Sequence, residues 1–181
     1  MATVLFSVDP GLSGAIAVWA DGRLVEVAEI PTLSRPKAAA RRGDGTVRHG
    51  VVSEVNVPAL SAIFRKYAPE DRAACATVIE RVGAMPKNGA VAMFAFGKAA
   101  MAPEAVSLAY GIPVEFLRPQ EWKKALGLGQ DKEESRMLAQ RLYPNLDFSK
   151  KSSHNMAEAV LIGRVYLSRR SAAAATKEDD R

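Results

Sequence analysis

Three acidic residues stand where apolar segments end or are interrupted. Asp9 follows the apolar run of residues 3–8, Glu80 follows the run 77–79, and Glu158 lies within the apolar stretch 156–162. An ionised carboxylate beside a buried segment is costly unless hydrogen bonds, a cationic side chain or a metal ion compensates its charge. Three such residues in one small chain predict a shared cation site.

A histidine accompanies the last of these carboxylates. His154 precedes Glu158 by four residues, so on a helix both side chains share one face near the positive N-terminal end. A neutral imidazole there can act as a ligand or a proton carrier. The alternative is structural: His154 caps the helix, and Glu158 pairs with Lys150 or Lys151. The spacing alone leaves both interpretations open.

Oxygen ligands without cysteine favour Mg²⁺ or Mn²⁺ over zinc. Two such ions, held by Asp9, Glu80, Glu158 and His154, can activate water and stabilise a departing phosphate-ester oxygen. This chemistry fits phosphodiester hydrolysis in a nucleic acid. Each nearby cation is by itself typical of an ordinary surface, but together they could clamp phosphates; they are Arg81, Lys87, Arg118, Lys123 and Lys124.

Composition limits the class of protein. A chain of 181 residues predicts one domain with its own core, and 25 Lys and Arg against 20 Asp and Glu, with a pI near 9.5, favour a polyanionic partner. The single Cys75 excludes an internal disulfide and a cysteine-rich zinc site; it precedes an apolar run, which predicts a buried, inert thiol. Without a signal pattern or an apolar stretch of about 18 residues, we expect a soluble intracellular protein.

The hydrophobic pattern supplies the elements that would position these residues. Strands are expected at 3–8, 15–19, 24–30, 75–80 and 114–117, and helices at 57–67, 88–110, 120–126, 131–142 and from Ser152 or Ser153 to 169. Asp21-Gly22 predicts a hairpin turn, and the helix 88–110 is either continuous or broken near Gly97 or Pro103. This order predicts an α/β sheet with an antiparallel opening and a parallel continuation, in which Asp9 and Glu80 face each other if their strands are neighbours.

Two segments fall outside this core. Residues 31–50 combine glycine and proline with five cations and one acid, which predicts an exposed mobile loop, either a solvated connector or an arm that contacts a polyanion. Residues 170–181 have little to bury and are expected to be a disordered tail. Residues 1–169 would then form the folded domain.

Five motifs occur in order at residues 7–15, 79–86, 93–97, 118–127 and 154–159. Together they resemble the RuvC-like resolvases of phages and bacteria, which belong to the RNase H-like nuclease superfamily. The resemblance spans residues 3–167. It implies an RNase H-like mixed five-stranded sheet and a homodimeric endonuclease that needs Mg²⁺ or Mn²⁺, with two ions per active site. Such an enzyme cuts four-way (Holliday) or other branched DNA by paired nicks, in the cytoplasm of a bacterial cell or a phage-infected host and without a membrane.

The resemblance also assigns residues. Asp9 and Glu80 would be metal ligands, and Glu158 would be the carboxylate of the final helix. The bacterial enzymes place two acidic or His positions three residues apart in the last motif, whereas here Asn155 stands three residues before Glu158 and His154 stands four before it. We favour His154 as the fourth member, because it can bind a metal ion or transfer a proton.

The loop after Glu80 and the following helix are the expected junction-reading element. Four apolar or aromatic side chains there could stack on splayed bases, although the two aromatic ones are equally suited to a core; they are Met85, Pro86, Phe94 and Phe96. The small residues of the helix 88–110 suit a dimer face or ordinary packing. Further DNA contacts are expected from Arg41, Arg42, Lys150 and Lys151.

Two other classes of protein compete with the nuclease. A phosphate-binding domain of the actin and sugar-kinase type also carries an Asp-x-Gly turn in its first hairpin, but the chain lacks a second glycine-rich phosphate loop. A branched-DNA-binding relative with a decayed site is the other. The presence of Asp9, Glu80 and Glu158 argues against a decayed site. The choice between His154 and Asn155 at the fourth position keeps this alternative open.

Overall fold

A computed structural model describes residues 3–37, 40–41, 43–44, 46–48, 50–84 and 88–179. Their centre is a mixed five-stranded sheet of order β3-β2-β1-β8-β9. The first three strands pair antiparallel, and β1, β8 and β9 pair parallel. The strands are β1 (Val4–Asp9), β2 (Ala15–Ala20), β3 (Arg23–Glu29), β8 (Cys75–Glu80) and β9 (Val114–Leu117). The predicted sheet is confirmed.

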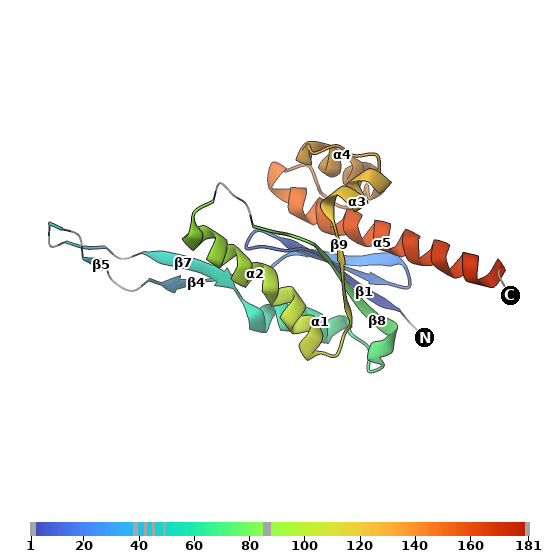
Figure 1. Ribbon diagram of the computed structural model, residues 1–181, viewed down its shortest axis with the longest axis horizontal. Coiled ribbons are helices and arrows are strands. Elements are labelled where there is room, and N and C mark those ends of the chain that lie inside the picture. The colour runs from blue at the N-terminus through green and yellow to red at the C-terminus, as the bar shows by residue number, and fades with distance from the viewer. Residues whose placement is uncertain are drawn as a thin grey trace.

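Helices cover both faces of this sheet, as Figure 1 shows. On one face α1 (Val57–Tyr67) and α2 (Ala90–Ala109) pack against Phe6, Val8 and Ile79. On the other face α3 (Pro119–Ala125), α4 (Lys132–Leu142) and α5 (His154–Asp179) cover Leu5 and Val78. The central strands are apolar on both faces because both faces are covered. Cys75 is buried, and burial raises the pKa of its thiol, as an inert core cysteine requires.

Short turns fix the ends of the elements next to the sheet. At the β2–β3 hairpin Asp21 and Gly22 have φ of 49° and 74°, the left-handed pair that a tight Asp-Gly turn needs. Short 3₁₀ turns, Arg72–Ala74 and Lys151–Ser153, precede β8 and α5. The Ser153 hydroxyl donates to the carbonyl of Lys150, and α5 begins at the next residue, His154.

The basic segment after β3 is not an irregular loop. It forms a long antiparallel ribbon from β4 (Thr32–Pro36) and β7 (Val51–Val55), continued by β5 (Ala40–Arg41) and β6 (Val47–Arg48). This ribbon, called the arm below, projects from the body (Figure 1). β-branched residues such as Thr32, Val47 and Val51 favour extended chain, and Thr46 donates from its amide and its hydroxyl to Asp44 near the tip. The described residues of this segment are largely exposed, as predicted, but they are paired strands and not a loop.

One helix is longer than predicted, and the question of a break in another is settled. α5 continues to Asp179, so the expected disordered tail is helical up to that residue; residues 180–181 lie outside the described chain. Four consecutive alanines in this segment have the highest helix propensity and extend the helix without burial. α2 is continuous through Gly97 and Pro103, because Ala99, Ala102 and Val106 hold it against the sheet.

The outer face of α2 is unusually apolar. By length and composition this helix is long and apolar enough to cross a membrane, whereas no apolar stretch of about 18 residues was expected from the sequence. In the fold α2 contacts α1, β7, β8 and β9, and it carries the charged residues Lys98 and Glu104. It is thus a helix of the domain, with an outer apolar face toward solvent.

Candidate active site

Two of the three carboxylates come from the ends of adjacent parallel strands. β1 and β8 are in register up to the pair Val8 and Ile79, so the next residues, Asp9 and Glu80, lie side by side. Both line a pocket of about 680 Å³ at the carboxyl edge of the sheet. This is the edge where α/β folds place their ligands. The prediction that these two strands are parallel neighbours is confirmed, and Asp9 and Glu80 line the same pocket.

Helix α5 brings the third carboxylate to the same pocket. Glu158 lines it and is 5% exposed, and Asn155, one turn earlier, lines it too. The position of α5 is fixed by Ser7, whose hydroxyl donates to the carbonyl of Ala159 over 2.8 Å. At Gly163 the helix comes so near to β1 and β2 that a methyl group would overlap neighbouring side chains. Close packing on the strands therefore aims Glu158 at the strand ends.

Helix α3 contacts two of the carboxylates with neighbouring residues. The indole Nε1 of Trp122 donates to Oε1 of Glu80 over 2.8 Å. The ammonium of Lys123 lies 3.2 Å from Oε1 of Glu158. Lys123 was expected as a phosphate clamp, whereas a role for Trp122 was not predicted. Only its place beside Lys123 in a motif pointed to it, since an indole 42 positions from Glu80 gives no local signal.

One oxygen of Glu158 is poorly compensated. Its Oε1 is buried and receives no hydrogen bond, because the nearby Lys123 ammonium lacks hydrogen-bond geometry. A buried charged oxygen without a donor is destabilising. Glu158 therefore offers the pocket a buried, negatively charged oxygen, which is suited to a cation.

The donor set has the chemistry of a hard-cation site. Carboxylate and amide oxygens of Asp9, Glu80, Asn155 and Glu158 are ligands that Mg²⁺ and Mn²⁺ prefer. Within the described ranges, however, no three His, Cys, Asp or Glu side chains are placed so that they could hold one ion. The carboxylates share a pocket without converging on one point.

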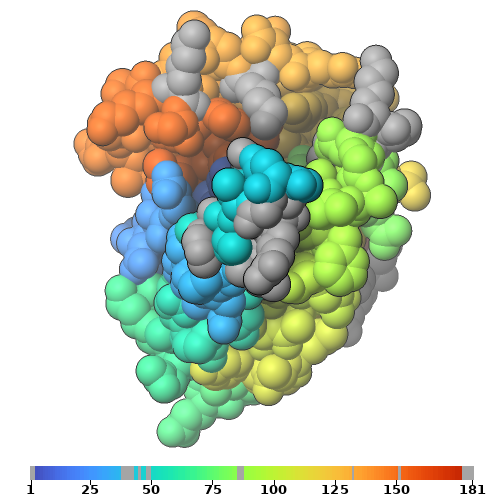
Figure 2. Space-filling model, turned by 90° about the vertical axis from the view of Figure 1, so that its left-hand side faces the viewer, coloured from blue at the N-terminus to red at the C-terminus, as the bar shows by residue number. Residues whose placement is uncertain are grey.

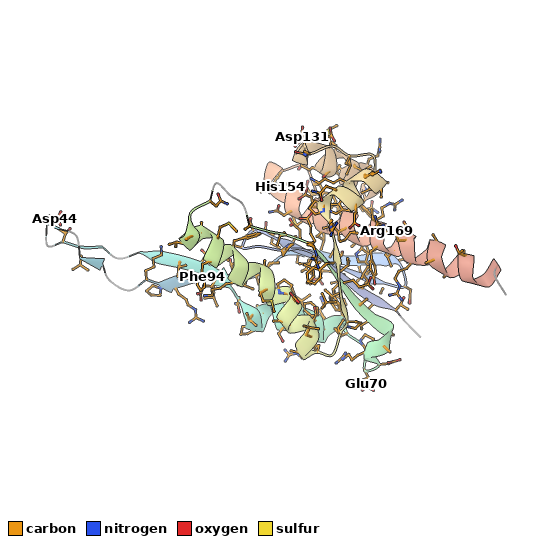
Figure 3. The ribbon with its side chains drawn as sticks, viewed as in Figure 1. Asp44, Glu70, Phe94, Asp131, His154 and Arg169 are labelled. Carbon is orange, nitrogen blue, oxygen red and sulfur yellow. The ribbon has the colours of Figure 1, made fainter. Side chains whose placement is uncertain are left out.

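The two candidates for the fourth position, His154 and Asn155, lie differently relative to the pocket. His154 is not among the residues that line the pocket, whereas Asn155 is. The Asn155 amide also donates to the carbonyl of Ser13, in the loop after β1. Figure 3 labels His154 at the start of α5. The role assigned to His154 stays a prediction, and this placement gives it no support.

The other residues predicted to contact DNA do not gather at one place: some line the pocket, and others lie elsewhere on the surface. Phe96 lines the pocket, while Phe94, which Figure 3 labels on α2, lies in a separate groove between α2 and the arm and is 73% exposed. Arg81 stacks over the Phe116 ring. Arg118, Lys124 and Lys150 are exposed. Arg42, Met85, Pro86 and Lys87 lie outside the described residues, as do the side chains of Arg41 and Lys151.

The protein has a mixed five-stranded sheet between two helical layers, and carboxylates stand at the ends of its first and fourth core strands. This is the RNase H-like arrangement. No protein-family model matches the sequence, and no curated protein matches it. The fold does match solved structures. RuvC of Thermus thermophilus in complex with a Holliday junction substrate aligns with a TM-score of 0.53 and 17% identity, over 93% of this chain and 96% of that one.

A second structure of Thermus thermophilus RuvC aligns with a TM-score of 0.51 and 20% identity, over 93% of this chain and 97% of that one. At these identities the likeness establishes the fold. Because it extends over nearly the whole of both chains, the protein has a RuvC-like fold throughout and not only in the strands of the sheet. The actin and sugar-kinase alternative receives no support from these matches.

Proposed function

We propose that this protein is a metal-dependent, structure-selective DNA endonuclease that resolves four-way or other branched DNA by paired nicks. The observation that carries the proposal is the pocket that Asp9, Glu80 and Glu158 line together at the strand edge of a RuvC-like fold, where one buried oxygen of Glu158 receives no hydrogen bond. The solved neighbour bound to a Holliday junction supports the choice of substrate.

In this proposal the three carboxylates and the Asn155 amide hold Mg²⁺ or Mn²⁺, two ions per site. When bound, the ions supply an activated water and stabilise the departing phosphate-ester oxygen. Trp122 donates to Glu80, and Lys123 lends positive charge beside Glu158 until a divalent cation takes its place.

The arm is proposed to hold a duplex arm of the junction. It projects from the same end of the molecule to which the carboxyl ends of β1 and β8 point, and Figure 2 views this end with the arm in front of the body. Its sequence carries Arg35, Lys37, Arg41, Arg42 and Arg48. Cations on a ribbon can follow the phosphates of DNA without reading its bases.

Paired nicks require two active sites, and a homodimer through α2 would supply them. Four apolar side chains on the outer face of α2 are exposed, at a spacing that keeps them on one side of the helix; they are Val91, Phe94, Met101 and Leu108. An exposed apolar patch of this kind marks an interaction surface. Light scattering after size exclusion should give a dimer for the wild type and a monomer for Met101→Glu.

A second candidate function is that of a branched-DNA-binding protein with an inactive site. The observation in its favour is that the carboxylates do not converge within the described structure and that an ammonium lies against Glu158. A cleavage panel separates the two functions. With Mg²⁺ or Mn²⁺ we expect nicking of four-way junctions well ahead of three-way, flap and linear DNA. Binding to the junction without nicking in either metal favours the inactive relative.

A further inference from the structure

Both tryptophans of the chain are buried, and their indole groups have different acceptors. Trp19 donates over 2.9 Å to the hydroxyl of Ser7, a neutral group within the core. Trp122, which is fully buried, donates over 2.8 Å to Oε1 of Glu80, a half-buried carboxylate of the pocket. Only the second hydrogen bond joins the core to a charged group of the candidate site.

The backbone around Trp122 makes this donor rigid. In the β8–β9 register Glu80 lies opposite Leu117, and α3 begins two residues after Leu117, so the chain turns back over the strand end. Pro119 starts α3, and the side chain of Glu121 accepts from the amide of Arg118 to close its first turn. The Trp122 ring packs in the core cluster beneath α5. The indole is thus held in place independently of Glu80.

A buried indole N–H needs an acceptor, and any nearby carbonyl would satisfy it. A carboxylate acceptor forms a charge-assisted hydrogen bond, which is stronger than one to a neutral carbonyl and restrains the rotation of the carboxylate. Glu80 is half-buried and has a flexible side chain of three rotatable bonds. Fixing Oε1 of Glu80 reduces the entropy that the side chain would lose when it binds a cation.

We propose that Trp122 is a positioning residue that fixes the Glu80 carboxylate for cation binding through its indole N–H. The proposal rests on the proposed function, since it assigns Glu80 to a cation site. Groups that orient the ligands of a metal ion typically contribute 10- to 100-fold to its affinity. Trp122→Phe, which keeps a buried ring and removes the N–H, should therefore weaken Mn²⁺ binding by about 10-fold or more.

Tyr110→Phe is the control, because it keeps the ring and removes a hydrogen-bonding group away from the pocket, where the Tyr110 hydroxyl contacts Ser61. Free Mn²⁺ in titrations of the DNA-free protein would be counted by electron paramagnetic resonance. We expect Tyr110→Phe to bind Mn²⁺ like the wild type and Trp122→Phe to bind it more weakly. Equal affinities of the wild type and Trp122→Phe overturn the role of Trp122 alone. A wild type that binds no Mn²⁺ contradicts the proposed function as well.

A second measurement covers the case in which Trp122→Phe does not fold. The two indole N–H groups give separate signals in a nitrogen-correlated NMR spectrum, and each has a known acceptor. Glu80→Gln replaces the charged acceptor by a neutral one of the same shape. We expect the Trp122 signal to move and the Trp19 signal to stay. A Trp122 signal unchanged by Glu80→Gln overturns the proposal, because the indole would then not be hydrogen-bonded to this carboxylate.

Discussion

The Lys123 ammonium lies 3.2 Å from Oε1 of Glu158, and both side chains are largely buried, at 17% and 6% exposed. Removing one member of such a pair leaves the other charge uncompensated. Lys123→Met should therefore lower the free energy of unfolding by about 1–3 kcal/mol in EDTA. Mg²⁺ should restore most of the loss, because a divalent cation replaces the missing charge.

Urea denaturation with and without Mg²⁺ measures this effect. The neighbouring Lys124 is exposed, so Lys124→Met is the control and should leave stability within about 0.5 kcal/mol of the wild type. If Lys123→Met is as stable as Lys124→Met in EDTA, the ion pair does not compensate Glu158.

Asn155 and His154 can be separated by substitution. Asn155 lines the pocket and His154 does not, so Asn155→Ala should reduce nicking by about 10-fold or more, and His154→Ala should reduce it less. Asn155→Asp, which keeps an oxygen donor in the same position, should retain activity and tighten Mn²⁺ binding. Initial rates at saturating junction DNA compare the three. A larger loss for His154→Ala would restore histidine as the fourth member of the site.

Gly163 tests the packing that places Glu158. A Cβ at this position would lie 2.3 Å from the Trp19 Nε1 and 2.5 Å from the Ser7 Oγ, distances that force α5 away from the sheet. Gly163→Ala should cost about 1–3 kcal/mol of stability despite the better helix propensity of alanine. In α2, Gly97 has open space around the same position, so Gly97→Ala should be neutral or stabilising by up to about 1 kcal/mol. Thermal melting in which the two variants match would disprove the close contact.

Glu26 gives the stability of the fold a predictable pH dependence. It joins β3 to α1 by accepting from Lys66 and Tyr67, and the hydrogen bonds from Lys66 and then Tyr67 hold the pKa of Glu26 below its ordinary value of 4.5. A lowered pKa adds stability above the unfolded pKa, and this stability is lost as the pH falls through the folded pKa.

Glu26→Gln should accordingly melt at a lower temperature than the wild type at pH 7. The corresponding loss in the free energy of unfolding should be less than about 1 kcal/mol, because solvent screens the pair. The difference should vanish in acid below the folded pKa of Glu26. Melting curves recorded between neutral and acidic pH compare the two proteins. A difference that stays constant over this range would mean that the carboxylate charge is not responsible.

The sheet and the two strand-end carboxylates could be predicted because local signals determine them. Apolar runs ending in Asp9 and Glu80 define buried parallel strands, and parallel neighbours bring their ends together. The arm was missed because the glycines, prolines and cations of residues 31–50 outweighed Val47, Val51 and Thr32, whose extended pairing needs a partner strand. The choice between His154 and Asn155 depends on how α5 docks, which Ser7 and Gly163 decide from distant positions. Trp122 was missed because its acceptor, Glu80, lies 42 positions away in the sequence.

The proposed function requires that Asp9 and Glu80 form one divalent-cation site and that this site cuts branched DNA. The most direct measurement is Mg²⁺-dependent nicking of a synthetic four-way junction by the wild type, Asp9→Asn and Glu80→Gln, with junction binding measured in Ca²⁺. We predict that both substitutions abolish nicking and leave binding intact, because they remove ligand charge without changing shape. Nicking by both variants at the wild-type rate would contradict the account.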